Sequence, residues 1–262
     1  MQESQTSIVI TGASAGLGRA LALLYAEPGR TLGLMGRNAE RLQVIAQLCR
    51  ARGARVETHA CDLCAGSSGR NFIQAFGDAR PIDLWIVNAG VFAGHRRERQ
   101  MEEADEITAV LRTNLEAAIL TIAAAVPQMR ARRAGRIAIV GSLAALQPLA
   151  DAPAYSASKA GLIAYGEALR EYLEPDGVQV SLINPGHIET AQVEAHVGAL
   201  PLIASAETAA ARIKRGLERG QEHIAFPRRL HWLIRAGRLL PWRLRAHLGR
   251  SQRFEVDRSY GQ

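Results

Sequence analysis

The chain has 262 residues and a formal net charge of +7, with 48% hydrophobic and 22% charged residues. This length suits one α/β domain with a sizeable core, and the composition excludes an intrinsically disordered chain. No apolar run reaches the roughly 18 residues of a membrane-spanning helix, and the starting MQESQTS lacks the features of a secretory signal. We therefore expect a cytoplasmic protein.

The first half of the chain alternates short β-branched runs with helix-forming segments. Residues 7–11 predict a strand, and the glycine-rich turn after them leads into a helix at 17–25 that Pro28 and Gly29 end. Further strands are expected at 31–35, 54–59 and 82–87, and further helices at 38–52 and 66–77.

The second half continues the alternation. Residues 101–131 predict one long helix or two consecutive helices, 153–173 predicts another helix, and strands are expected at 136–140, 177–183 and 223–226. Apolar strands that alternate with helices indicate a buried parallel sheet. We predict an α/β fold with a Rossmann-like, doubly wound parallel sheet of about seven strands. We place this single domain at residues 6–227 and a basic helical C-terminal extension at 228–262.

The positive charge lies in that extension. Residues 228–253 contain eight arginines and no acid, whereas the rest of the chain has 24 basic and 25 acidic residues. A helix at 229–240 would carry an apolar stripe with arginines around it. Two interpretations stay open: the stripe packs on the protein itself or on a partner subunit, or residues 228–250 make peripheral contact with an anionic membrane surface. Nucleic-acid binding rests on charge alone, and we predict none.

The three cysteines predict no metal site. Cys49, Cys61 and Cys64 form neither a disulfide framework nor a zinc ligand set, so we expect reduced packing thiols and no metal.

A glycine-rich loop follows the first predicted strand. The loop at 11–18 reads T-G-A-S-A-G-L-G. Alone it is compatible with an ordinary turn, but between a strand and a helix it predicts a dinucleotide site, because small residues admit a diphosphate to the helix N-terminus.

A phenol and an ammonium stand four residues apart in Tyr155-Ser-Ala-Ser-Lys159, on one face of the predicted helix. We expect Lys159 to lower the pKa of Tyr155 from its usual value of about 10, so that the phenol exchanges a proton near neutral pH. Together with Ser142, Asn114 and the glycine loop, this pair indicates a nicotinamide-dependent oxidoreductase.

The ordered set of motifs resembles the short-chain dehydrogenase/reductase superfamily over roughly residues 6–227. Besides those above, the shared motifs are C-D-L at 61–63, N-A-G at 88–90 and N-P-G-H-I-E-T at 184–190. The resemblance implies a catalytic tetrad: Tyr155 as acid and base, Lys159 on the cofactor ribose, Ser142 on the substrate oxygen, and Asn114 holding a water. It also implies cofactor contacts from Gly12, Ser14, Gly16, Leu17, Gly18, Arg37, Asp62, Leu63, Asn88, Ala89, Gly90, Tyr155, Lys159, Ile188 and Thr190.

Those contacts have assigned places on the cofactor. By resemblance, Asp62 and Leu63 lie at the adenine, 88–90 at the adenosine ribose, and Ile188 with Thr190 at the nicotinamide carboxamide. Val87 departs from the family, which often has asparagine there. All of these residues would contact a single dinucleotide.

Cofactor choice depends on the residue after the second strand, where an acid binds a ribose hydroxyl and an arginine binds a 2′-phosphate. Here Arg37 follows Gly36, and no acid occurs before Glu40. We therefore predict NADP(H) rather than NAD. An ordinary solvated arginine is the alternative interpretation of Arg37, and Ala15, where many NADP-preferring relatives have a basic residue, makes the expected selectivity modest.

The predicted function is hydride transfer between NADP(H) and a carbonyl or secondary alcohol. The substrate would lie among residues 91–100, 143–153 and a lid at 187–205; the mostly aliphatic 143–153 segment favours an apolar compound. The alternative is a non-catalytic nucleotide-sensing or scaffold protein on the same fold. The long helices at 101–131 and 153–173 resemble those that pair subunits in the family, so we expect a homodimer or homotetramer.

Overall fold

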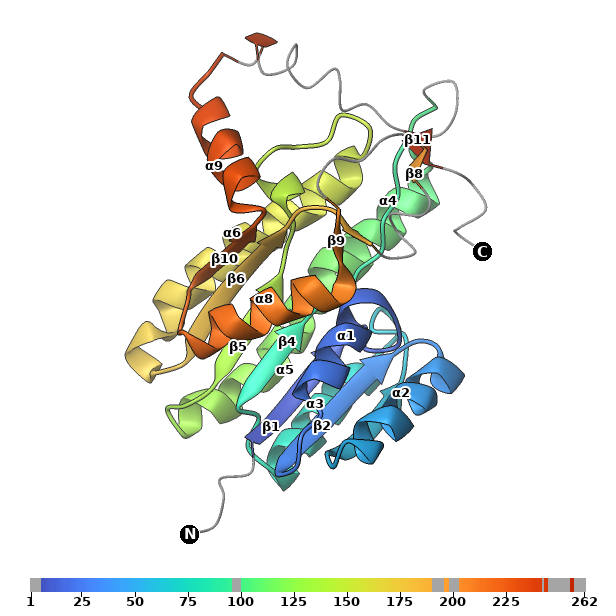
Figure 1. The fold of residues 1–262 in the computed structure, drawn as a ribbon, viewed down its shortest axis with the longest axis vertical. Coiled ribbons are helices and arrows are strands. Elements are labelled where there is room, and N and C mark those ends of the chain that lie inside the picture. Colours follow the sequence, from blue (N-terminus) through green and yellow to red (C-terminus); the bar gives the residue numbers. More distant parts are fainter. Residues whose placement is uncertain are drawn as a thin grey trace.

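One parallel sheet of seven strands organises the protein, in the order β10-β6-β5-β4-β1-β2-β3 (Figure 1). The computed structural model describes residues 6–95, 100–189, 203–241 and 243–244, and the backbone alone at 196–197 and 255–256. The predicted fold class and strand number are confirmed, with the 223–226 strand at the sheet edge. The strands are β1 (Thr6–Thr11), β2 (Arg30–Gly36), β3 (Arg55–Ala60), β4 (Leu84–Val87), β5 (Arg136–Val140), β6 (Gln179–Pro185) and β10 (His223–Phe226).

Helices cover both faces of the sheet (Figure 1). Side chains of β1 alternate between the two layers: Ile8 and Ile10 pack in one core and Val9 in the other. Because both faces are buried, the central strands are apolar throughout, as a parallel sheet requires. One layer contains α1 (Gly16–Tyr25), α2 (Ala39–Ala51) and α8 (Ala206–Glu218); the other contains α3 (Ser68–Ala79), α4 (Ala104–Leu111), α5 (Ala118–Ala131) and α6 (Pro153–Leu173).

Residues 104–131 form one continuous helix that is α-helical at both ends and π-helical in the middle. A π-helical segment, η2 (Arg112–Ala117), joins α4 to α5. By length and composition Ala104–Ala131 is apolar enough to cross a membrane, which run lengths in the sequence did not indicate. The side chains of Ala118, Ile122 and Met129 are buried against the sheet, so we describe it as a core helix.

Helix α8 was not predicted, although the chain carries a signal for it. Ser205 caps its start by accepting a hydrogen bond from the backbone N–H of Thr208 at 3.1 Å. Ala209, Ile213 and Leu217 recur at four-residue spacing and are buried in the same core as α1. A serine cap followed by this period is sufficient to predict the helix.

Short elements complete the fold. The 3₁₀ helices η3 (Leu143–Ala145) and η4 (Glu174–Asp176) follow β5 and α6, respectively. Two small sheets pair β7 (Ile188–Glu189) with β9 (Ala204–Ser205) and β8 (His196–Val197) with β11 (Glu255–Val256). The C-terminal α9 (Arg228–Gly237) extends directly from β10, and its bounds agree with the predicted helix to within three residues.

Candidate active site

Parallel topology brings the predicted site residues together at the carboxyl ends of the strands. The glycine loop follows β1, the N-A-G motif follows β4, Ser142 follows β5, and N-P-G ends β6. Because all these strands are parallel, the loops at their carboxyl ends meet at the same edge. Helix α6 carries Tyr155 and Lys159. Thr190, assigned to the carboxamide, lies outside the described residues.

The glycine loop adopts backbone conformations that depend on its glycines. Gly12 and Gly16 have φ of +67° and +50°, a region that side chains rarely occupy. A Cβ on Gly18 would lie 2.1 Å from the carbonyl oxygen of Gly12, so no larger residue fits without movement. Helix α1 starts at Gly16 with no side-chain cap and no acid in its first turn. Its first N–H groups are therefore suited to an anionic group, and the loop fits a dinucleotide.

Thr11 joins the glycine loop to the loop after β4. Its buried hydroxyl accepts the backbone N–H groups of Asn88 at 2.9 Å and Ala89 at 3.0 Å. The Asn88 amide donates in return to the Thr11 carbonyl at 2.9 Å. The Asn88 side chain thus braces two cofactor loops against each other. We did not predict this role of Thr11, although a threonine at the strand end was visible in the sequence.

Asn114 joins the π-helical segment to the same edge. Its Oδ1 accepts from the Val91 N–H at 2.7 Å, and its Nδ2 donates to the Val91 carbonyl at 2.8 Å and to Ser158 Oγ at 3.2 Å. A Cβ on Gly90 would lie 3.1 Å from Asn114 Oδ1 and 3.5 Å from Lys159 Nζ. Three separate segments therefore meet at Gly90, where a side chain would make a tight contact with the Asn114 amide.

Lys159 is a buried cation with one backbone acceptor. Its Nζ donates to the Val140 carbonyl at 3.0 Å and lies 5.9 Å from the centre of the Tyr155 ring. The side chain is only 5% exposed, and burial lowers the pKa of Lys159 to about 8. The ammonium is thus held in the interior close to the phenol.

Tyr155 differs from the sequence-based expectation in the direction of its pKa. Burial raises the pKa of the phenol, and the nearby Ser142 hydroxyl opposes this only in part. The expectation that Lys159 lowers it is therefore corrected, because removal of water is the largest cause of the shift. Ser142 follows β5 and caps η3, where its Oγ accepts from the Ala144 N–H at 3.1 Å. The Ser142 hydroxyl thus lies near enough to affect the Tyr155 phenol, as two groups that bind one further oxygen would.

Apolar and paired groups flank these hydroxyls. The Phe92 ring lies edge-on against Tyr155, with centroids 4.8 Å apart and planes at 67°. The backbone N–H of His95 donates to the Asp151 carbonyl at 2.6 Å, and His95 Nδ1 lies 3.7 Å from the buried Asp151 carboxylate. These contacts join residues 91–95 to 143–152, which belong to two of the segments predicted to surround the substrate. Asp151, the charged residue of the 143–153 segment, makes its contact with His95 at this junction.

The remaining predicted cofactor residues lie after β2, after β3, at the start of α1 and in β7. Arg37 is exposed directly after β2, and Ser14 Oγ would lie 3.1 Å from a Cβ on Gly36. Asp62 Oδ1 accepts from the Cys64 N–H at 2.9 Å, which shapes the turn after β3. Leu63 packs over Gly69, Leu17 is buried at the start of α1, and Ile188 forms part of β7.

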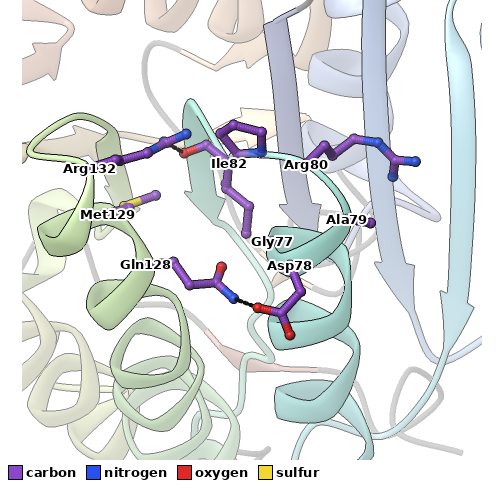
Figure 2. A pocket seen from close by; sticks show the side chains of 9 residues that line it. Gly77, Asp78, Ala79, Arg80, Ile82, Gln128, Met129 and Arg132 are labelled. Carbon is purple, nitrogen blue, oxygen red and sulfur yellow. Dashed lines mark hydrogen bonds between the residues drawn. The ribbon is translucent and has the colours of Figure 1, made fainter.

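A separate cavity lies at the opposite end of the sheet (Figure 2). It is lined by residues 77–82 and by Gln128, Met129 and Arg132. Gln128 Nε2 donates to Asp78 Oδ1 at 2.7 Å across it, and Arg132 donates to the Ile82 carbonyl. Because Ile82 precedes β4 whereas Asn88 follows it, this cavity is not part of the candidate site.

Known proteins match both the sequence and the fold. The family model described as short chain dehydrogenase matches residues 6–198. An "uncharacterized oxidoreductase" of Myxococcus xanthus is 33% identical over 239 residues, which cover 91% of this chain and 94% of that protein.

Two solved structures share the fold. A short-chain dehydrogenase from Sphingobium yanoikuyae, in complex with NADPH, has a TM-score of 0.77 at 24% identity and covers 93% of this chain and 94% of its own. One from Burkholderia phymatum, in complex with NAD, has a TM-score of 0.79 at 23% identity and covers 90% and 93%.

Removal of the Thr11 hydroxyl should destabilise the junction of the two cofactor loops. Thr11→Val keeps the shape but leaves two N–H groups without an acceptor, so we expect a loss of about 2–4 kcal/mol in unfolding free energy. Urea denaturation measures it. Thr11→Ser, which keeps the hydroxyl, is the control and should lose less than half as much; equal losses would contradict the bracing role.

Proposed function

The chain belongs to the short-chain dehydrogenase family of oxidoreductases, and we propose that it transfers a hydride between NADP(H) and an apolar ketone or secondary alcohol. The observation that carries the proposal is the placement of the Ser142 hydroxyl, after β5, near the Tyr155 phenol and beside the buried Lys159 ammonium. A substrate oxygen held by both hydroxyls would exchange its proton with Tyr155. The nicotinamide, when bound, supplies or accepts the hydride.

The electrostatics of the site favour a proton donor at neutral pH. Burial keeps the proton on Tyr155, since it raises the pKa of the phenol. When Tyr155 gives up that proton to a carbonyl oxygen, the Lys159 ammonium, whose Nζ lies 5.9 Å from the centre of the phenol ring, stabilises the resulting negative charge. Ser142 donates to the same oxygen and orients it. These roles suit reduction of a carbonyl.

Asn114 acts on this chemistry through position. Its two hydrogen bonds to Val91 fix the start of the wall that carries Phe92. Phe92 in turn packs on Tyr155 and presents an apolar ring to the substrate region. Leu143 and Leu146 lie in the facing segment, and Asp151 is buried at its end. This environment supports an apolar substrate.

The preference for NADP(H) rests on Arg37. This guanidinium is exposed at the carboxyl end of β2 and forms no hydrogen bond or ion pair with a described residue. Ser14 lies close to the same strand end. An available guanidinium, a nearby hydroxyl and no acid at this point favour a 2′-phosphate over a bare ribose. The glycine loop and α1 would hold the diphosphate.

We also propose a cytoplasmic homodimer or homotetramer that contains a catalytic domain at 6–227 and a separate extension at 228–262. Leu120 on α5 and Tyr172 on α6 are large apolar side chains exposed on the helices that would pair subunits. A non-catalytic nucleotide sensor is the competing function, but binding alone does not need a proton-relaying phenol. A screen of ketones with NADPH and NADH, followed by nicotinamide absorbance, separates the two.

Loss of the phenol hydroxyl should abolish turnover. For Tyr155→Phe we expect kcat to fall about 10²–10⁴-fold with NADPH affinity within a few-fold of wild type, because the ring remains. Tyr165→Phe removes a hydroxyl elsewhere on α6 and is the matched control. Retention of about a tenth of wild-type kcat in the first variant would refute the proton-transfer role.

Cofactor choice should change at Arg37. We expect Arg37→Asp to weaken NADPH binding by about 1.5–3 kcal/mol and to leave NADH binding unchanged or stronger. Fluorescence titration of both cofactors measures this. Arg41→Asp makes the same charge change on the exposed surface of α2 and should have little effect; a wild type that binds both cofactors equally well contradicts the assignment.

Carbonyl reduction should decline as pH rises through about 8, where buried Lys159 loses its proton. The measurement is kcat/KM against pH. Above that pH the unfolded chain still holds a proton on this lysine that the folded chain has lost. The contribution of Lys159 to the free energy of unfolding therefore increases with pH until the ordinary lysine pKa is reached. Circular dichroism at each pH should therefore show no unfolding from this cause. A flat rate profile across this range would show that the lysine charge is not required.

A further inference from the structure

We propose that α9 and the described residues that follow it, 238–241 and 243–244, form a binding surface for an anionic lipid membrane. Five of the eleven exposed large apolar side chains in the described part of the chain lie in this short segment. Trp232, Leu233 and Leu239 are 60%, 70% and 88% exposed, and Leu240 and Leu244 are also exposed. A gathering of this kind marks a contact surface rather than ordinary scatter.

The helix stands away from the protein body. Figure 1 shows α9 beyond the end of the sheet, attached through β10. No residue of α9 is buried, although its sequence is strongly amphipathic. Leu230 and Ile234 are half-buried, whereas Trp232 and Leu233 are exposed and lack the core contact that stabilises most helices of this length.

Positive charge surrounds these apolar side chains. Arg228, Arg229, Arg235 and Arg238 lie on or next to α9, and residues 228–244 contain no acid. None of these four forms an ion pair with another residue in the described ranges. The Arg235 guanidinium lies 5.7 Å from the centre of the Trp232 ring, so cation and indole are presented together.

This composition favours an anionic membrane over other partners. Tryptophan and leucine bury at the boundary between headgroups and acyl chains while arginines contact acidic headgroups. A second copy of the helix would bring arginines against arginines and is disfavoured by repulsion. Nucleic acid would satisfy the arginines but leave the exposed Leu233 and Leu239 in water.

The surface is close to the candidate active site. Gly186, at the end of the N-P-G motif, donates its N–H to the Phe226 carbonyl at 2.7 Å, and α9 starts two residues after Phe226, at Arg228. Ile203, 46% exposed, precedes the strand that pairs with β7 beside the same loop. A bilayer under α9 would thus lie at the substrate side; this consequence alone rests on the proposed function, and it favours substrates dissolved in lipid.

Vesicle co-sedimentation of the full-length protein tests the binding without any substrate. We expect binding to vesicles of phosphatidylcholine with phosphatidylglycerol, none to phosphatidylcholine alone, and loss at about 1 M salt, where the Debye length is about 3 Å. Arg235→Gln with Arg238→Gln should lower the partition coefficient about 25-fold, at about fivefold for each arginine. Trp232→Ser with Leu233→Ser should lower it at least about tenfold.

The matched control is Val44→Ser with Leu48→Ser on α2, which removes two exposed apolar side chains (54% and 43% exposed) far along the chain from α9. It should bind like wild type. Each variant must keep the wild-type unfolding midpoint and oligomeric state. Folded wild type that does not bind anionic vesicles, or binding that ignores the α9 variants, overturns the proposal. Dissociation of an oligomer by the Trp232 and Leu233 changes would instead identify a subunit interface and also overturn it. Failure of the hydride-transfer proposal leaves these outcomes unaffected.

Discussion

Parallel pairing of β1 with β4 determines where the site can form. The register sets Ile8 beside Leu84 and Ile10 beside Ile86, so both strands end at the same level. The chain after β1 and the chain after β4 therefore emerge side by side, and Thr11 connects them through its hydroxyl. A cofactor loop assembled from such distant segments depends on this register, because a shift by one residue would turn every side chain to the other face.

Burial of one positive charge shapes the chemistry next to this junction. An ammonium without water is costly, and Lys159 has its described hydrogen bond to the Val140 carbonyl as compensation. The same dry surroundings strengthen its attraction for any negative charge that develops on Tyr155. Gly90 and Asn114 pack near Nζ, and burial in these surroundings lowers the pKa of Lys159.

The C-terminal extension differs from the α/β domain in the exposure of its apolar residues and in its net charge. The α/β domain buries its apolar residues in two layers, whereas α9 leaves Trp232 and Leu233 exposed and surrounds them with arginine. A body with nearly balanced charge and an extension with unbalanced positive charge are suited to different surroundings. The contact between Gly186 and Phe226 nevertheless attaches this extension to the edge that carries the candidate site.

The sequence by itself determined the parts that local pattern controls. The 153–173 helix and the 136–140 and 223–226 strands agree with the prediction at both ends, and the seven-strand parallel sheet follows from their alternation. The identities of Tyr155, Lys159, Ser142 and Asn114 as candidates came from motif order. These features are visible because periodicity, turns and short motifs involve residues close in the chain.

Only the tertiary structure decided the direction of the Tyr155 pKa, the partners of Asn114 and the bracing role of Thr11. Each depends on groups tens of residues away and on how much water the fold removes. The π-helical segment that carries Asn114 likewise has no local signal that we recognised. Burial and long-range hydrogen bonds are properties of the packed chain, and for that reason a single sequence does not reveal them.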